Sequence, residues 1–124
     1  MSISQRAAAP APPQSNRIVS DDELEKALDF LRDSAAAIGA ARAEMIRCAH
    51  MVKVIRALET KRYNHLPVSR AEIEALASDE YMDALNNDAA AAGEFEKLRA
   101  LREAATMRIE SWRSESASIR AMRI

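Results

Sequence analysis

Residues 21–63 read DDELEKALDFLRDSAAAIGAARAEMIRCAHMVKVIRALETKRY, and this stretch decides the fold. Its apolar side chains recur at alternating steps of three and four residues, the spacing of one face of a long helix. We assign to this row Leu24, Leu28, Leu31, Ala35, Ile38, Met45, Ala49 and Val52. The pattern predicts one helix from about Asp21 to about Tyr63, in which Arg42 is a gap in the row and Gly39 marks a bend or a close contact.

The same helix carries a second apolar stripe beside the first row. Its members are Ala27, Ala37, Ala41, Cys48, Ile55 and Leu58. Apolar positions that cover so wide an arc indicate more than one helical neighbour. A two-helix hairpin alone is also thin for a stable fold. We therefore expect a homo-oligomer, with hairpins packed as a coiled coil or a bundle.

A second long helix follows a short connection. Asn64-His65-Leu66-Pro67 ends the first helix, because proline lacks an N–H and disfavours helix at the residue before it. The capping-box spacing Ser69–Glu72 predicts a short helix to about Ala77, and Ser78-Asp79-Glu80 begins the second long helix. The apolar periodicity of this second long helix is weakest over residues 86–93. The second helix places on one stripe Tyr81, Leu85, Phe95, Leu98, Leu101, Ala105, Ile109, Trp112 and Ile119.

The charges form four blocks of alternating sign. Residues 21–33 carry six acids against two bases, and residues 42–62 carry six bases against two acids. Residues 69–96 carry eight acids against one base, and residues 97–124 carry seven bases against three acids. Antiparallel pairing of the two helices sets acid beside base in both halves, whereas parallel pairing sets like charges together. The blocks therefore predict a helical hairpin, although the same pairing can also form between chains.

Composition supports an all-α class. Alanine and other helix formers dominate, and aromatic residues make up 4% of the 124 residues. Residues 1–19 contain the Ala/Pro-rich segment Ala7–Pro13, which favours extended backbone without a face to bury, so we expect a disordered tail. The predicted fold is two long antiparallel helices with a short connecting helix in one domain, 20–124, behind that tail. Ser20–Glu23 has the spacing of a capping box at the start of the first long helix.

Residues that signal catalysis or metal binding are sparse. The chain has no Gly-rich phosphate loop, no HExxH and no Gly-x-Ser-x-Gly elbow. Cys48, His50 and His65 do not have zinc-ligand spacing, and we interpret Cys48 as a small buried apolar residue. We therefore expect no enzyme activity, no cofactor and no metal. A secretory signal and a membrane-spanning apolar run are not evident, so we expect a cytoplasmic protein, in the host cell if it is phage-encoded.

The candidate binding residues form a basic strip. A row of cations can follow a phosphate backbone, and a nearby aromatic ring can stack on an exposed base. Against this, the antiparallel pairing partly neutralises these cations with the acidic block at residues 79–96. The candidate nucleic-acid-binding residues are Arg42, Arg47, Lys53, Arg56, Lys61, Arg62 and Tyr63.

Three phrases of the sequence resemble a family of small helical phage and prophage proteins. They are Ala41-Arg42-Ala43-Glu44 followed by Lys53 and Lys61, then Ala77-Ser78-Asp79-Glu80-Tyr81, and then Ile109-Glu110-x-Trp112-Arg113-Ser114-x-x-Ala117-x-x-Arg120. More distantly, the arrangement resembles the UvsY-type recombination mediators. That resemblance implies an oligomer that binds single-stranded DNA and helps to load a recombinase. The chain departs from a strong DNA binder in its net charge of -1.

Two classes of function follow from these observations. The first is a non-catalytic phage-type accessory protein of DNA recombination, which binds single-stranded DNA and recombination proteins as an oligomer. The second is a protein-directed helical scaffold, assembly factor or inhibitor of a host protein. Its interface would be the stripe around Ala37, Ala41, Cys48 and Ile55, or the acidic face over residues 72–96, which can mimic DNA.

Overall fold

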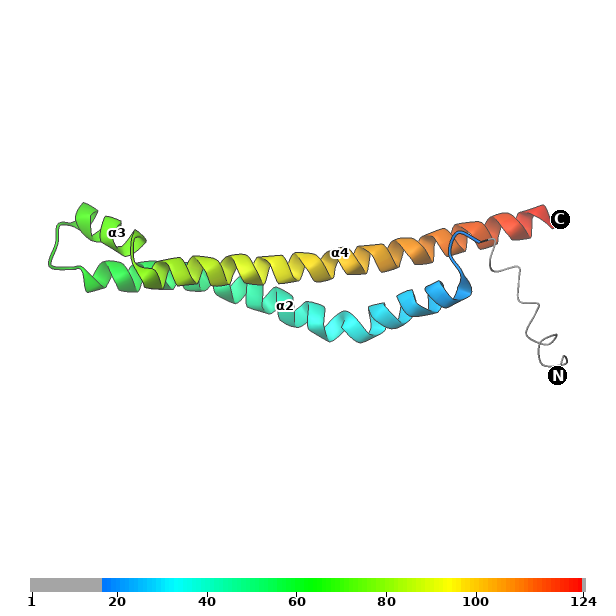
Figure 1. Ribbon diagram of the computed structural model, residues 1–124, viewed down its shortest axis with the longest axis horizontal. Coiled ribbons are helices and arrows are strands. Elements are labelled where there is room, and N and C mark those ends of the chain that lie inside the picture. Colours follow the sequence, from blue (N-terminus) through cyan, green and yellow to red (C-terminus); the bar gives the residue numbers. More distant parts are fainter. Residues whose placement is uncertain (1–16, 124) are drawn as a thin grey trace, which may run out of the picture. The chain divides into compact units, whose positions relative to one another are not determined.

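The computed structural model describes residues 17–123 and contains three helices in that range. Helix α2 spans Asp21–Arg62, α3 spans Val68–Leu76 and α4 spans Asp79–Met122 (Figure 1). The predicted fold class is confirmed: the chain is all-α, with two long antiparallel helices and a short connecting helix. Residues 86–93, the least periodic part of the second stripe, lie within α4 without interruption.

The chain divides into two compact units, and each contains part of α2 and part of α4. We call the first the terminal unit; its described residues are 17–34 and 101–123. We call the second the turn unit; it comprises Ala35–Ala100 and includes α3. Most of the predicted tail, residues 1–16, lies outside the described residues.

In the turn unit, the buried side of α2 follows a regular alternation of three and four residues. Ala35 and Ala49, which we placed in the main row, are exposed. Ala41, Cys48 and Ile55, which we placed in the second stripe, lie at buried or half-buried positions instead. The seam positions of α2 here are Ile38, Ala41, Met45, Cys48, Val52, Ile55 and Glu59. The observed seam has no gap at this level, because its position between Ile38 and Met45 is Ala41 and not Arg42.

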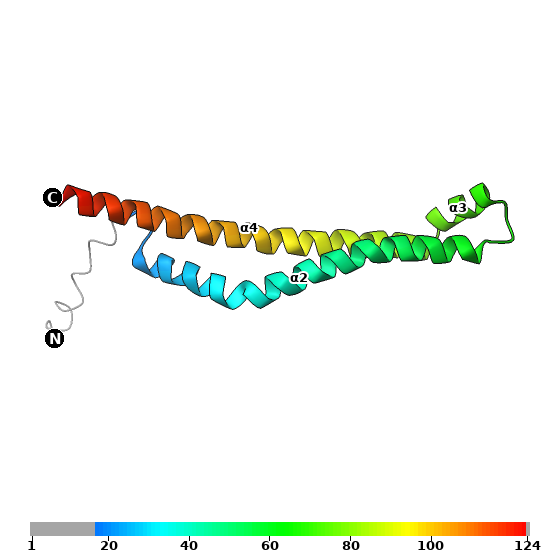
Figure 2. The ribbon, with the colours of Figure 1, turned by 180° about the vertical axis from the view of Figure 1, so that it is seen from behind.

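The α4 side of the turn unit has the same alternation. Ala84 and Ala91 are buried, whereas Leu85, which we expected in the stripe, is 36% exposed. The buried or half-buried positions that follow this alternation are Tyr81, Ala84, Asp88, Ala91, Phe95 and Leu98, and Ala92 beside them is also half-buried. Helix α3 lies beside the ends of α2 and α4 that it connects, as Figure 2 shows from behind, and it buries Ala71 and Ala75. Small side chains thus occupy most of the buried sites in this unit.

In the terminal unit, the first turns of α2 lie beside the last turns of α4. Ala27 and Ala105 are buried at 4% and 2% exposure, whereas Leu28 is 49% exposed. Trp112 Nε1 donates a hydrogen bond to Asp21 Oδ1 at 2.9 Å, which joins the two helices. The order of these contacts shows that the helices run antiparallel in this unit.

Residues just before α2 also contact α4. The Arg17 guanidinium donates to Glu115 Oε1 at 3.3 Å, to Ser116 Oγ at 2.6 Å and to the Trp112 carbonyl oxygen at 3.2 Å. Its Cζ lies 4.9 Å from the centre of the Trp112 ring, within cation–π distance. Val19 is buried at 5% exposure. Arg17 and Val19, which we assigned to the tail, are therefore part of the packed terminal unit.

Side-chain caps begin both long helices. Glu23 N–H donates to Ser20 Oγ at 3.1 Å, and Ser20 N–H donates back to Glu23 Oε1, so the predicted capping box of α2 is confirmed. Ser78 Oγ accepts from Tyr81 N–H at 3.2 Å and caps α4. The predicted Ser69–Glu72 box is wrong: the N-cap of α3 is Pro67, without a side-chain cap.

Ion pairs form mainly within helices. The blocks of opposite sign do lie side by side in each unit, as the hairpin requires, and Arg62 of α2 pairs with Glu80 of α4 at 3.6 Å. Other pairs link neighbours on one helix, such as Lys97 with Glu94. Exposed pairs of this kind each contribute about 0–1 kcal/mol. Charge therefore favours one orientation of the helices but does not hold them together strongly.

The described core consists of small side chains. Its buried apolar residues are Val19, Ala27, Cys48, Ala71, Ala75, Ala84, Ala91 and Ala105. Among the described residues, no large side chain falls below 2% exposure, while Leu58, Ile73 and Met82 are each more than half exposed. Apolar burial contributes about 25 cal/mol per Å². The folded chain therefore leaves much of its large apolar surface in solvent.

Candidate nucleic-acid interface

The predicted basic strip lies in the turn unit, along α2 and at its end. Positions separated by three or four residues share one side of a helix. Arg42, Lys53 and Arg56 therefore share a side, and all three are exposed. At about 1.5 Å per residue, Arg42 and Arg56 are about 21 Å apart along the axis. Lys61, also exposed, stands in the last turn of the helix.

Two of the predicted cations form ion pairs with carboxylates of the same chain. Arg47 Nε lies 2.9 Å from Glu44 Oε2, one turn earlier on α2. Arg62 Nη1 lies 3.5 Å from Glu59 Oε1 and 3.6 Å from Glu80 Oε1. Arg62, one of the candidate binding residues, therefore lies between two carboxylates. The sequence did not reveal this, because Glu80 meets Arg62 only after the chain has turned.

The remaining four cations have no acid partner among residues 17–123. They are Arg42, Lys53, Arg56 and Lys61. Their ammonium and guanidinium groups are therefore available to an anion without breaking an ion pair within the chain. Phosphate oxygens are strong acceptors for such groups.

The aromatic member of the set, Tyr63, follows the end of α2 and is half-buried. The Cζ of Arg62 lies 5.9 Å from the centre of its ring, and the His65 ring centre lies 6.3 Å away at an interplanar angle of 42°. Arg62 thus lies over the ring. The Tyr63 ring is less available for stacking on a base than the sequence suggested.

A small apolar recess adjoins the basic row and was not predicted. It has a volume of about 360 Å³. Its other four residues lie three, four, seven and eight residues before Lys53. That spacing places them on one face of the helix, so the sequence contained a usable signal for the recess. The recess is lined by Met45, Ile46, Ala49, His50 and Lys53.

Cys48 lies on the opposite flank of α2 from Lys53. Its thiol donates to Glu44 Oε1 at 3.4 Å, and it is buried at 5% exposure. Burial raises the pKa of the Cys48 thiol, and the hydrogen bond to the Glu44 carboxylate raises it further. Cys48 is therefore held as a neutral thiol, which is a poor nucleophile and a poor metal ligand.

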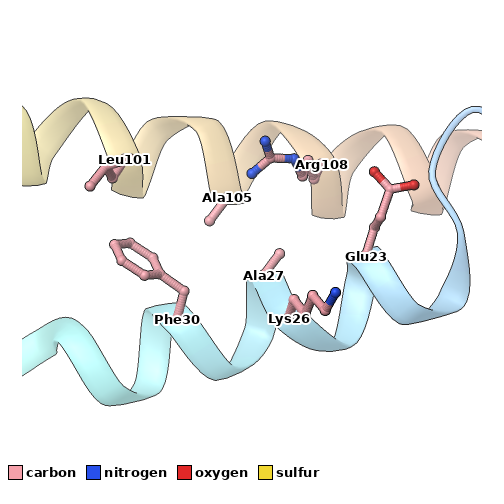
Figure 3. A pocket seen from close by; sticks show the side chains of 7 residues that line it. All are labelled: Glu23, Lys26, Ala27, Phe30, Leu101, Ala105 and Arg108. Atoms are coloured by element: carbon pink, nitrogen blue, oxygen red, sulfur yellow. The ribbon is translucent and has the colours of Figure 1, made fainter.

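The terminal unit contains an apolar groove of about 350 Å³ (Figure 3). Ala27 on α2 and Ala105 on α4 form its floor, and Phe30 and Leu101 lie at one end. Charged side chains lie toward the other end. The lining residues are Glu23, Lys26, Ala27, Phe30, Leu101, Ala105 and Arg108.

Residues 17–123 contain neither a cluster of metal ligands nor a helix that could span a membrane. No group of three or more His, Cys, Asp or Glu side chains there is placed to hold a metal ion. None of the described helices combines the length and apolar character that crossing a membrane requires. The expected lack of a catalytic site stays a prediction.

Comparison with known proteins gives no relative for the chain. No family model, no curated protein and no solved structure matches it.

Proposed function

We propose that this chain is a non-catalytic accessory protein of phage-type DNA recombination that binds single-stranded DNA along α2. One observation carries the DNA part. Arg42, Lys53, Arg56 and Lys61 are exposed on one helix without an acid partner in the described chain, whereas neighbouring Arg47 and Arg62 are paired. The recombination part rests on the resemblance of scattered sequence phrases.

The binding is electrostatic, because among residues 17–123 the aromatic ring nearest the strip in sequence, Tyr63, is half-buried and has Arg62 over it. Each phosphate contact releases counterions, so the logarithm of the affinity falls linearly with the logarithm of salt concentration. Four contacts to a single strand give a slope of about -3. The modest number of contacts also predicts that affinity rises when several copies share one strand.

The test is a salt titration with a fluorescent oligonucleotide and a triple variant, Lys53→Glu, Arg56→Glu and Lys61→Glu. We expect the variant to lose binding at about 50 mM salt, where phosphate contacts are strong. The matched control reverses three exposed bases of α4, Lys97, Arg102 and Arg113, and so changes the net charge equally. The control should retain binding. Equal loss in both variants would mean that net charge alone controls binding and would overturn the assignment to α2.

A protein-directed role is the second candidate, favoured by exposed apolar side chains on α2. Met51, Val54 and Leu58 lie within two turns and are 37%, 45% and 55% exposed. The stripe that we expected for this role is not the surface, since Cys48 is buried and Ala41 and Ile55 are half-buried in the seam. Such a role would suit a scaffold, an assembly factor or an inhibitor of a host protein.

The discriminating experiment is a pull-down from nuclease-treated host lysate with the wild type and the Leu58→Glu variant. A partner that the wild type retains and Leu58→Glu loses, together with no oligonucleotide binding, supports the protein-directed role. Oligonucleotide binding that depends on Lys53 and Arg56 supports the first proposal.

A further inference from the structure

The groove of the terminal unit is incompletely filled by the chain that forms it. Ala27 and Ala105, at 4% and 2% exposure, lie between the two helices at its floor, and the larger apolar side chains of the lining, Phe30 and Leu101, lie at one end only (Figure 3). Leu101, at one end, is 47% exposed, and Phe30 beside it is half-buried. Large apolar side chains around a concave apolar floor are typical of a protein contact.

The charges around the groove differ between its two helices. On the α2 side, residues 21–33 carry six acids against two bases, and the α4 side belongs to the block of seven bases against three acids. Glu23 and Arg108 lie toward the same end of the groove, on opposite helices (Figure 3). Arg108 has no ion pair with any described residue, although it borders an apolar surface. An unpaired cation at such a rim favours a partner with an acid at the matching place.

A second copy of this chain has an acid at that place. We propose that two copies associate through this groove about a twofold axis parallel to the helices, so that α2 of each copy lies on α4 of the other. Phe30 then meets Leu101 of the second copy, and Glu23 meets Arg108 of the second copy. Because the axis is twofold, each contact occurs twice. The result at this unit is four helices, each beside antiparallel neighbours.

The charges also select this arrangement over the other twofold arrangement. An axis across the helices would stack α2 on α2 and α4 on α4, which sets acid against acid and base against base. It would also bring Glu23 toward Phe30 of the second copy and leave its carboxylate facing an apolar ring. The proposal is independent of DNA binding, since it uses none of the α2 cations in the turn unit.

The first test uses complementary charge reversals at the two ends of the proposed ion pair. In a Glu23→Arg homodimer both contacts become base against base, and in an Arg108→Glu homodimer both become acid against acid. In a mixture of the two variants, both contacts of the heterodimer are opposite in charge. We expect each variant alone to be monomeric by light scattering at concentrations where the wild type is dimeric, and an equimolar mixture to recover the dimer mass.

Glu23 also belongs to the capping box, so circular dichroism of each variant is recorded first. A second variant avoids the cap: Leu101→Glu changes an exposed apolar residue of the proposed contact and should leave helicity unchanged while abolishing the dimer. Met107→Glu, at 68% exposure on the same helix and outside the groove lining, is the matched control and should remain dimeric.

Three outcomes would overturn the proposal. They are a wild type that is monomeric at all concentrations, an oligomer whose mass Leu101→Glu leaves unchanged, and a variant mixture that stays monomeric while the wild type dimerises. DNA binding that persists in a monomeric Leu101→Glu variant would leave the proposed function intact, so the failure of one proposal is distinguishable from that of the other.

Discussion

Glu59 is the one carboxylate of α2 at a buried seam position of the turn unit. It is 7% exposed, and its Oε1 finds no hydrogen-bond donor among the described residues, although Arg62 Nη1 lies 3.5 Å away. A buried carboxylate with a single long ionic contact is poorly compensated. We expect this buried charge to favour one register of α2 against α4 over the others.

Cys48 should react slowly with thiol reagents in the folded protein. Its pKa is raised by burial and by the hydrogen bond to Glu44, so less of it is thiolate near neutral pH than in an exposed cysteine. Because the folded state holds this proton more tightly than the unfolded state, the stability from the neutral thiol is lost as pH rises through the unfolded pKa and then the folded one. Maleimide labelling followed over pH, folded and in urea, measures both effects. Equal rates in the two states would contradict the prediction.

Gly39 offers a stabilising substitution. A Cβ atom built there meets nothing within 4 Å, and its φ is not positive; of the two expectations for Gly39, a bend or a close contact, the close contact is therefore wrong. Gly39→Ala should therefore raise the free energy of unfolding by about 1 kcal/mol through helix propensity alone. Urea denaturation measures it. Ala36→Gly, at an exposed position three residues earlier, should lower the free energy by a similar amount; no change in either variant would show that this part of α2 is frayed.

At the scale of the element, the two long helices begin with a side-chain cap, whereas α3 begins without one. Ser20 and Ser78 each accept a hydrogen bond from a backbone N–H of the first turn, whereas Ser69 lies inside α3 after Pro67. The Ser69–Glu72 spacing failed as a signal because Pro67 already starts the helix, and proline is well suited to a helix start.

Ser78→Ala should lower the free energy of unfolding by about 1 kcal/mol, because the N–H of Tyr81 loses its acceptor and the carbonyl of Ala75 loses the hydroxyl donor. Ser69→Ala is the matched control within the same unit. It should change the free energy by no more than about 0.5 kcal/mol. Thermal or urea unfolding of the pair measures the difference, and a larger loss at Ser69 would mean that α3 is capped there after all.

Helix existence and approximate ends were predictable, but the buried face was not. Ala27 lies in the seam and its neighbour Leu28 is exposed, and in the same way Cys48 lies in the seam and its neighbour Ala49 is exposed. Because the two residues of each pair are adjacent, either one satisfies a spacing of three and four residues. In the first pair, the larger Leu28 was the natural choice for a core. Two helices approach each other where side chains are small, so in this chain Ala and Cys took the seam, and Leu28 was left half in solvent.

At the scale of the whole molecule, the small core leads us to expect that stability depends on association with a second copy. Without any large, fully buried side chain among residues 17–123, the isolated chain gains little from apolar burial. If a second copy covers the groove of the terminal unit, the midpoint of thermal unfolding should rise with protein concentration. Calorimetry over about two orders of magnitude in concentration measures it. Leu101→Glu should remove the dependence, and a constant midpoint in the wild type would contradict the prediction.

The sequence by itself determined the helices, the turn at Pro67 and the antiparallel order, because these depend on local spacing, proline chemistry and the sign of charge blocks. It also placed the basic strip on one helix. The pairs of Arg47 with Glu44 and of Arg62 with Glu59 follow the local spacing of three residues. Only the tertiary structure brought Glu80 to Arg62 across the turn and left Arg42, Lys53 and Arg56 without a described acid. It also decided which apolar side chains stay exposed, because that depends on how closely two helices approach, and one-dimensional spacing does not contain that distance.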